Sequence, residues 1–411
     1  MRRPSISAIV PNYNHARFLE ERVRSILAQK HAVDEVIILD DASTDDSREV
    51  IRRISAAAPV PIITAFNETN SRNIFKQWNK GLSLASTDLA WICESDDSCD
   101  PNFLDALAPY FDDPSVMVAF GRVEYIDANG AHLDDKNGHM ARSNFWREPR
   151  IESARAWFNG PFAARNIIAN VGGCVFRRQQ ILPALMDELQ SYKICGDWFL
   201  YSRLAHGGRI AYEPSARAYF RQHGQNSSVI SRKSEAFYDE HLRIARALRR
   251  HYGTPEKILE LLLQNAWMQC GSHLGRDAAR KFAQTDPLRD IMTEKRTVPH
   301  IIITMPENAD GELMKQISSE AESISSQGGD AAILIYAPVA TAIGLRPQIE
   351  PHIPIFSREV LQHLGPKTFL QEFGVSSVIS LAPRSDAELR DACSKLGLSH
   401  FDRPRQDSEK L

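Results

Sequence analysis

The hydrophobic positions in the first hundred residues follow two alternating patterns. Short continuous apolar runs predict buried strands, and apolar residues spaced three or four positions apart predict helices. The predicted strands cover 7–10, 35–39, 61–65 and 89–93, and the predicted helices between them cover 16–29, 50–54 and 75–85. Strands that alternate with helices are typical of an α/β fold with a parallel or mostly parallel sheet. Ligands bind beyond the carboxyl ends of the strands in such sheets, so the loops there are candidates for a site.

Beyond residue 116 the pattern is less regular, and the alternation returns at residue 300. The middle of the chain predicts strands over 116–126 and 172–177, a long connection over 132–162, a helix over 198–205 and several helices over 234–295. The last part predicts strands over 300–304, 331–336 and 377–381. It also predicts a helix over 312–326, ended by Gly328-Gly329, and a second helix over 359–373. We therefore expect an α/β domain at 1–230, a helical linker at 231–296 and a small C-terminal Rossmann-like α/β domain at 297–411.

The composition excludes several classes of protein. Of 411 residues, 43% are hydrophobic and 25% are charged, which excludes a wholly disordered chain. With 49 basic and 52 acidic residues the net charge is −3, so we expect no nucleic acid as a partner. No apolar run approaches the ~18 residues of a membrane span, and the start of the chain lacks a signal-peptide core. The six cysteines form no C-x-x-C pair, so we expect reduced thiols in a cytoplasmic protein.

Acidic residues follow the second predicted strand, where a site is expected. Asp40 and Asp41 come directly after it, and a carboxylate there can accept hydrogen bonds from a base edge or a ribose. The alternative is that Ser43, Asp45 or Asp46 simply caps the next helix, as happens in most proteins. Spacing alone leaves both interpretations open.

A second acidic cluster, Glu94-Ser95-Asp96-Asp97, follows the fourth predicted strand. Its three carboxylates repel one another unless they bind a cation, and on an extended segment Glu94 and Asp96 point the same way. That arrangement suits one hard divalent ion together with phosphate oxygens. The alternative, an acidic turn in solvent before a helix near Asp100, is equally compatible with the local sequence. A metal ion with a diphosphate ligand would explain both clusters.

Two further segments contain candidate chemistry. Asp197 precedes Trp198, and a partly desolvated carboxylate can have a raised pKa and act as a general base. From the local sequence alone, the favoured interpretation is an N-cap aspartate of the helix through Leu204. Arg221 and His223 share one side of an extended segment and could reach a phosphate and a metal ion. The alternative for that pair is an ordinary surface strand.

In chain order, these segments resemble glycosyltransferase family 2, whose members have the GT-A fold. The resemblance covers about residues 5–230. It rests on Ser7-Ala8-Ile9-Val10-Pro11-Asn12-Tyr13-Asn14, on 35–45, 70–78, Trp91-Ile92-Cys93-Glu94-Ser95-Asp96-Asp97 and 172–177, on Gly196-Asp197-Trp198 and on 219–228. It implies a GT-A nucleotide-diphospho-sugar transferase fold, with a mixed, mostly parallel sheet between helices. Family members often have glycine at the position of Arg72.

The resemblance implies which residues bind the nucleotide-sugar. Pro11 and Tyr13 would flank the nucleobase, and Asp40 or Asp41 would form a hydrogen bond with it. The other residues implied in this binding are Ser43, Asn70, Lys76, Asp97, Trp198 and Arg221.

It also implies a metal site and a base. Asp96 matches the last acid of the family's D-x-D motif, the ligand of Mg²⁺ or Mn²⁺ that bridges to the diphosphate. Glu94 would act through a water molecule, and His223 would approach the metal from the opposite side. Asp197 would be the general base on the acceptor hydroxyl.

The implied function is inverting, metal-dependent transfer of a sugar from a nucleotide-sugar to a hydroxyl of a saccharide or lipid-linked acceptor, in surface polysaccharide synthesis. A single base with direct displacement inverts the anomeric centre. Two alternatives remain open at this point. One is a metal-dependent nucleotidyltransferase or phosphatase, which also gathers acids at strand ends. The other is a nucleotide- or glycan-binding module that has lost turnover. The sequence leaves the oligomeric state open.

The remaining parts of the chain add two expectations. The segment from His300 has a faint similarity to the first βα unit of GT-B glycosyltransferases but contains no full G-x-G-x-x-G, so we expect a structural α/β domain there. The favoured interpretation of the basic helix is a solvated face, and its arginines are Arg243, Arg246, Arg249 and Arg250. The alternative is peripheral contact with an anionic inner membrane face that presents a lipid-linked acceptor.

Overall fold

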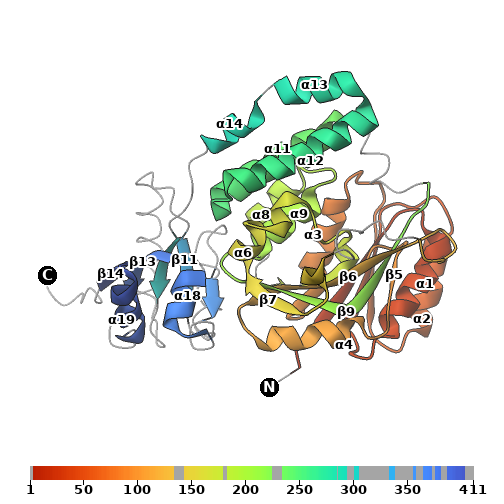
Figure 1. Ribbon diagram of the computed structural model, residues 1–411. Coiled ribbons are helices and arrows are strands. Elements are labelled where there is room, and N and C mark those ends of the chain that lie inside the picture. Colours follow the sequence, from red (N-terminus) through yellow and green to blue (C-terminus); the bar gives the residue numbers. More distant parts are fainter. Residues whose placement is uncertain are drawn as a thin grey trace, which may run out of the picture.

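The computed structural model contains two β-sheets and a set of long helices (Figure 1). It describes residues 3–133, 143–178, 183–224, 234–284, 286–293, 300–304, 333–337, 355–357, 364–372, 375–380 and 387–402. The larger sheet is formed by the first half of the chain and the smaller sheet by its last quarter.

The larger sheet has nine strands in the order β3-β2-β1-β4-β8-β6-β9-β5, with β7 paired to β9. They are β1 (Ile6–Asn12), β2 (Glu35–Asp40), β3 (Ile62–Phe66), β4 (Leu89–Ile92), β5 (Ser98–Cys99), β6 (Val116–Ile126), β7 (Arg150–Ser153), β8 (Cys174–Arg177) and β9 (Arg209–Arg221). The first four strands pair in parallel, β8 is antiparallel to both neighbours, and β6 and β9 are parallel. The predicted mixed sheet is therefore confirmed.

Helices cover both faces of this sheet (Figure 1). They are α1 (Ala16–Leu27), α2 (Ser47–Ala57), α3 (Ile74–Leu84), α4 (Phe103–Leu107), α6 (Ala154–Phe158), α7 (Pro161–Ala164), α8 (Pro183–Leu189) and α9 (Gly196–Leu204), with short 3₁₀ turns at Ala108–Asp112, Asn144–Trp146 and Val171–Gly173. Successive strand residues point to opposite faces. Ala8 and Ile38 accordingly pack in the core that includes α1, α2 and α4, whereas Ile9 and Ile37 pack in the core that includes α3 and α9.

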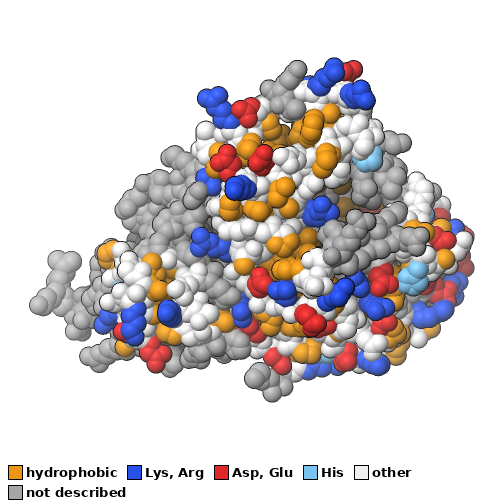
Figure 2. Space-filling model, viewed as in Figure 1, with side chains coloured by type: hydrophobic (Ala, Val, Ile, Leu, Met, Phe, Trp, Pro, Cys, Tyr) orange, Lys and Arg blue, Asp and Glu red, His pale blue; other side chains and the backbone are white. Residues whose placement is uncertain are grey.

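Four helices follow the larger sheet, as predicted for 234–295: α11 (Glu235–Tyr252), α12 (Glu256–Leu274), α13 (Arg276–Gln284) and α14 (Pro287–Met292). Ser234 caps α11 by accepting a hydrogen bond from the Ala236 N–H, and Gly253 ends the helix with φ +62°. Arg249 is buried, which contradicts the solvated face expected for it. Figure 2 shows apolar side chains among Lys and Arg on the surface of this helical part. Within the described stretches, no helix is both long and apolar enough to span a membrane.

The smaller sheet has the order β12-β11-β10-β13-β14, with every neighbouring pair parallel. Its elements are β10 (His300–Thr304), β11 (Ile333–Ala337), β12 (Ile355–Ser357), α18 (Pro366–Glu372), β13 (Val375–Ser380), α19 (Ala387–Leu396) and β14 (Ser399–Asp402). The three predicted strands are confirmed within a few residues, and β12, β14 and α19 were not predicted. The predicted helix over 312–326, its Gly328-Gly329 stop and residues 225–228 of the last motif lie outside the described residues.

Candidate active site

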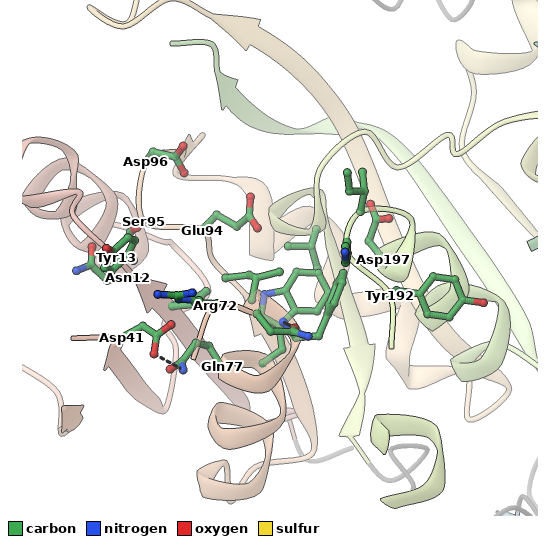
Figure 3. Close-up of a pocket in the computed structure, with 18 of the residues that line it drawn as sticks. Asn12, Tyr13, Asp41, Arg72, Gln77, Glu94, Ser95, Asp96, Tyr192 and Asp197 are labelled. Carbon is green, nitrogen blue, oxygen red and sulfur yellow. Dashed lines mark hydrogen bonds between the residues drawn. The ribbon is translucent and has the colours of Figure 1, made fainter. Parts of the chain in front are cut away.

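A cleft of about 950 Å³ opens at the carboxyl ends of the central strands. Its lining comes from segments that are distant in sequence, within 11–15, 70–78, 94–96, 169–171 and 190–197. β1, β2 and β4 run parallel, so the residues that follow them meet at one edge of the sheet. Figure 3 shows the cleft with Asp41, Glu94 and Asp96 contributed by these loops and Asp197 contributed from the opposite wall.

Four residues predicted to bind the nucleotide line this cleft: Pro11, Tyr13, Asp41 and Asn70. Tyr13 is 45% exposed, which leaves its ring available to stack on a base. The Asp41 carboxylate accepts hydrogen bonds from the Ser71 N–H (2.9 Å) and from the Gln77 amide (2.9 Å, dashed in Figure 3). Asp41 therefore also fixes the loop that forms the neighbouring part of the cleft.

Asp40 lies outside the cleft lining. It is fully buried and accepts a hydrogen bond from Arg48 Nε at 3.0 Å. Of the candidate caps, Asp46 is the N-cap of α2 but makes no side-chain capping hydrogen bond, whereas Asp45 Oδ1 accepts one from the Ser47 N–H (3.0 Å). The two interpretations of the 40–46 segment thus describe separate side chains.

Five other predicted binding residues are also absent from the lining: Ser43, Lys76, Asp97, Trp198 and Arg221. Ser43 Oγ accepts a hydrogen bond from the Asn14 N–H at 2.9 Å, and Lys76 is exposed. Trp198 is buried and donates its indole N–H to the Phe162 carbonyl (2.9 Å). These residues support the walls or lie beside the cleft.

Arg221 is buried beneath the acidic cluster. Its Nε donates to the Asp96 carbonyl oxygen (2.7 Å), and its main-chain N–H donates to Asp97 Oδ1 (2.8 Å). Its guanidinium also forms an ion pair with Glu21. Arg221 therefore fixes the loop after β4, whereas the sequence predicted direct contact with a phosphate.

His15, which the sequence analysis missed, joins Asp96 and His223. Nε2 of His223 lies 2.9 Å from Asp96 Oδ2, and Nδ1 of His15 lies 4.0 Å from Asp96 Oδ1. One ligand atom from each residue lies within 4.8 Å of the other two, a spacing that one metal ion can bridge after small rotations. Phe18 stacks on His223 at 5.2 Å, and Ser95 Oγ lies 2.9 Å from His15 Nδ1. The available signal was the place of His15 directly after the turn that ends the first strand.

The pKa shifts in this cluster leave His15 and Asp96 in the forms that bind a metal ion, whereas Glu94 tends to keep its proton. Burial lowers the pKa of His15, which keeps its imidazole neutral and able to ligate. Burial, the largest single effect, raises the pKa of Asp96, but the hydrogen bond with His223 and the charges of the two histidines together outweigh it, so that pKa is lowered. Burial, followed by the charges of Asp96 and Asp197, raises the pKa of Glu94 to about 8.

The donor set fits a divalent cation. Glu94, Asp96 and Asp97 also bring their carboxylate oxygens within 4.8 Å of one another. Oδ2 of Asp97 is buried and has no hydrogen-bond partner in the described part of the chain. Burial, and then the charges of Asp96 and Glu94, raise the pKa of Asp97 well above its usual range. Crowded carboxylates beside two imidazoles are a ligand set that Mg²⁺ or Mn²⁺ can use.

Asp197 lies in the first turn of α9 and lines the cleft. The helix has Cys195 as its N-cap, so the interpretation of Asp197 as the N-cap is wrong. Asp197 Oδ2 accepts a hydrogen bond from Asn166 Nδ2 at 2.9 Å, and Oδ1 accepts one from the Trp198 N–H at 2.6 Å. Burial raises the pKa of Asp197 to about 7, which is the range of a general base. Asn166 and Asn170, whose amide donates to Glu94 (3.1 Å), were not predicted.

Comparison with known proteins identifies the segment that contributes most of the cleft lining. Residues 7–182 match the family model described as glycosyl transferase family 2. This segment belongs to that family. The matched segment therefore contains both acidic clusters together with Asn166 and Asn170, whereas Asp197 lies beyond the matched residues.

Several curated proteins are similar to the chain. An uncharacterized glycosyltransferase of Nostoc sp. is 28% identical over 56% of this chain and 69% of its own length. The succinoglycan biosynthesis protein ExoO of Rhizobium meliloti is 25% identical, with 55% of this chain and 64% of ExoO covered. The putative teichuronic acid biosynthesis glycosyltransferase TuaG of Bacillus subtilis is 26% identical, with 32% and 52% covered. The chain therefore spans between about half and two thirds of the length of these relatives.

Among solved structures, the fold is similar to that of TarS 1–349 from S. aureus in complex with UDP-GlcNAc. The TM-score is 0.52 at 17% identity, with 71% of this chain and 82% of TarS 1–349 covered. At this identity the likeness concerns the fold, and it confirms the predicted GT-A type of architecture. With the family match, it supports the prediction of a transferase.

Proposed function

We propose that the protein transfers a sugar from a nucleotide-sugar to an acceptor hydroxyl, with a divalent cation and with inversion at the anomeric carbon. The observation that supports this most directly is that one cleft is lined by His15 and Asp96 on one side, with His223 beside Asp96, and by Asp197 on the other side. The first group suits an ion that neutralises a diphosphate, and Asp197 suits removal of a proton from a hydroxyl.

The donor half of the cleft is built from the strand ends. The Tyr13 ring stacks on the nucleobase, while Pro11 and Asp41 complete the base and ribose pocket. Asp96, His223 and His15 would hold Mg²⁺ or Mn²⁺, with Glu94 beside them. Such a cation, when bound, stabilises the negative charge that develops on the diphosphate as the sugar departs. Arg221 keeps Asp96 and Asp97 in place from below.

The acceptor half centres on Asp197. Its carboxylate, held by Asn166, accepts the proton of the attacking hydroxyl as the new bond to the anomeric carbon forms. A single direct displacement, assisted by one base, inverts the configuration at the anomeric carbon. Relatives with names in teichuronic acid and succinoglycan biosynthesis support a growing surface saccharide, free or lipid-linked, as the acceptor. We place the reaction on the cytoplasmic side of the membrane.

The test is calorimetric titration of the wild type and of Asp96→Ala with UDP and with GDP, in Mn²⁺ and in EDTA. We expect the wild type to bind one of the two more tightly with Mn²⁺ and the variant to lose that dependence, because Asp96 faces both histidines. Unchanged metal-dependent affinity in Asp96→Ala contradicts the assignment. Consumption of a nucleoside triphosphate, with no release of UDP or GDP from nucleotide-sugars, would instead support a nucleotidyltransferase.

A further inference from the structure

Residues 190–195, between α8 and α9, form the wall of the cleft that leads into Asp197. Five consecutive residues of this 190–195 wall, from Gln190 to Ile194, line the cleft. Figure 3 shows Tyr192 and Asp197 together on this side, away from Asp41 and Asp96. The wall lies beyond the segment that matches the family model, and so does α11, which packs against it.

Glu240 of α11 holds the end of this wall by its main chain. Glu240 is only 4% exposed. Its Oε1 accepts a hydrogen bond from the Lys193 N–H (2.7 Å), and its Oε2 accepts bonds from the N–H groups of Ile194 (3.0 Å) and Cys195 (2.8 Å). Three successive N–H groups at a helix start carry partial positive charge, and a buried carboxylate binds them through charge-assisted hydrogen bonds.

Arg243, three residues along α11 and on the same face, holds the middle of the wall. Its guanidinium carbon lies 3.7 Å from the centre of the Tyr192 ring, and its nitrogens donate to Ser191 O (3.2 Å) and Ser191 Oγ (2.6 Å). The Tyr192 ring also stacks with the Phe199 ring of α9, with their centres 4.8 Å apart. Arg243 thus ties the wall to the helix that carries Asp197.

The other end of the wall is fixed to the donor half. Nδ2 of Asn73 donates to the Gln190 carbonyl at 2.8 Å, and Asn73 also caps α3 through the Phe75 N–H. The wall therefore has one attachment to α3 and three consecutive ones to Glu240, which end two residues before Asp197. A shift at Cys195 moves Asp197 directly.

We propose that α11 positions the general base, with Glu240 and Arg243 as positioning residues that set Asp197 and the 190–195 wall against the acceptor saccharide. The inference rests on the proposed function. It assigns the acceptor half to a helix outside the matched family segment, whereas the donor half depends on β1, β2 and β4. Loss of Glu240 should therefore impair transfer to the acceptor and leave nucleotide binding intact.

The experiment compares Glu240→Gln with the wild type and with Asp239→Asn, a neighbouring acid on the exposed side of α11. Glutamine keeps the size of Glu240 but offers one oxygen and one NH₂ group, so at least one of the three N–H groups loses its acceptor. Three properties are measured for all three proteins. They are hydrogen–deuterium exchange at 193–195, the affinity for UDP and GDP with Mn²⁺, and the release of UDP or GDP from UDP-GlcNAc or GDP-mannose in the presence of octyl glycosides.

In Glu240→Gln we expect exchange at 193–195 at least ~10-fold faster, because charged hydrogen bonds are lost. We expect turnover to fall by roughly 10- to 100-fold through misplacement of Asp197, with UDP and GDP affinity unchanged. Asp239→Asn should match the wild type in every measurement. Partial recovery of turnover in Glu240→Asp would support a positioning role, because that variant keeps the charge.

Exchange and turnover of Glu240→Gln within about twofold of the wild type would overturn the proposal. If Glu240→Gln does not fold, Arg243→Lys decides by the same measurements, since lysine keeps the charge without the planar fork that contacts Ser191 and Tyr192. A wild type that binds neither UDP nor GDP contradicts the proposed function itself, and that result is distinct from a working wild type with unaffected variants.

Discussion

The Asp197 side chain is half-buried and lines the cleft, and both affect its chemistry. Asparagine at this position keeps the size of the side chain and a hydrogen-bonding oxygen, but it does not take the proton of a hydroxyl. We expect Asp197→Asn to lower turnover by about 10²–10⁴-fold. UDP and GDP affinity should stay unchanged, since the proposed donor contacts lie on the opposite wall. Near-normal turnover would exclude Asp197 as the base, and lost nucleotide binding would place it in the donor pocket instead.

The same carboxyl makes stability depend on pH. Burial raises the pKa of Asp197 from 3.8 to about 7, so between these values the folded protein holds a proton that the unfolded chain has released. The contribution of this group to stability therefore falls as pH rises from about 4 to about 7. In urea denaturation, Asp197→Asn should gain stability relative to the wild type between pH 4.5 and 7.5, by at most about 4 kcal/mol. An equal difference at both pH values would show that this pKa is not raised.

Arg72 occupies a backbone conformation that suits glycine. Its φ is +53°, which explains why the resembled family often has glycine there. Arg72→Gly and Arg72→Ala both remove the guanidinium, but only glycine relieves the left-handed strain. We expect Arg72→Gly to be more stable than Arg72→Ala by about 1 kcal/mol in chemical denaturation. Equal stabilities of the two variants would contradict this explanation. Because Arg72 lines the cleft, both should bind UDP and GDP less tightly.

At the scale of elements, the sequence predicted β1, β2, β3, β4, β6 and β8 because each contains an apolar run, whereas β9 (Arg209–Arg221), which Glu213 and Pro214 interrupt, was missed. β6 has the predicted bounds, and β1, β2, β3 and β4 differ by only one or two residues at their ends. β5, β7, β12 and β14 were missed, since segments of two to four residues are too short to give a periodic signal. Their place in a sheet is decided by neighbouring strands, which local sequence does not specify.

From the sequence, only those residues of the candidate site that follow the ends of strands could be predicted. Asp41, Asp96 and His223 lie at loops that the parallel topology brings together. Trp198 and Arg221 were placed in the site, but side-chain type does not reveal direction: Trp198 turns into the core and Arg221 under the acidic loop. Glu240 has no sequence signal, because its partners are backbone N–H groups 45 to 47 residues away.

The packing of α9 on α3 depends on a glycine. A Cβ added to Gly196 would lie 2.3 Å from the Phe75 ring, and that ring is buried against Trp78. Gly196→Ala should therefore push α9 and Asp197 away and cost about 1–3 kcal/mol. Gly271→Ala in α12 is the matched control, since its Cβ would meet only Ala279 at 3.6 Å. That variant should instead gain roughly 0.5–1 kcal/mol from helix propensity in denaturation experiments. Destabilisation by both would contradict the close-approach explanation.

At the scale of the whole molecule, the helical linker is more than a connection. α11 buries Ile244, Ala245 and Leu248 in the core that also contains α3 and α9. Thr254, just after α11, donates a hydrogen bond to the Phe158 carbonyl at 2.9 Å. A boundary at residue 230 therefore cuts through a packed core, although all the resembled motifs end before it. We propose that the functional unit extends to about residue 295.

Truncation separates these roles. Some C-terminal side chains, such as Phe369 and Leu370, belong to the same hydrophobic core as α11, but in the described stretches the strands β10 to β14 pair only with one another. We therefore expect a chain of residues 1–295 to fold and to bind UDP or GDP with Mn²⁺ as tightly as the full chain. A chain of residues 1–230 loses α11, and each fully buried apolar side chain left without its partner costs about 1.5–3 kcal/mol. We expect that chain to be unstable in urea denaturation. A folded 1–295 chain that binds neither nucleotide would show that the C-terminal unit helps to build the donor site, and a stable 1–230 chain with normal turnover would remove α11 from the catalytic unit.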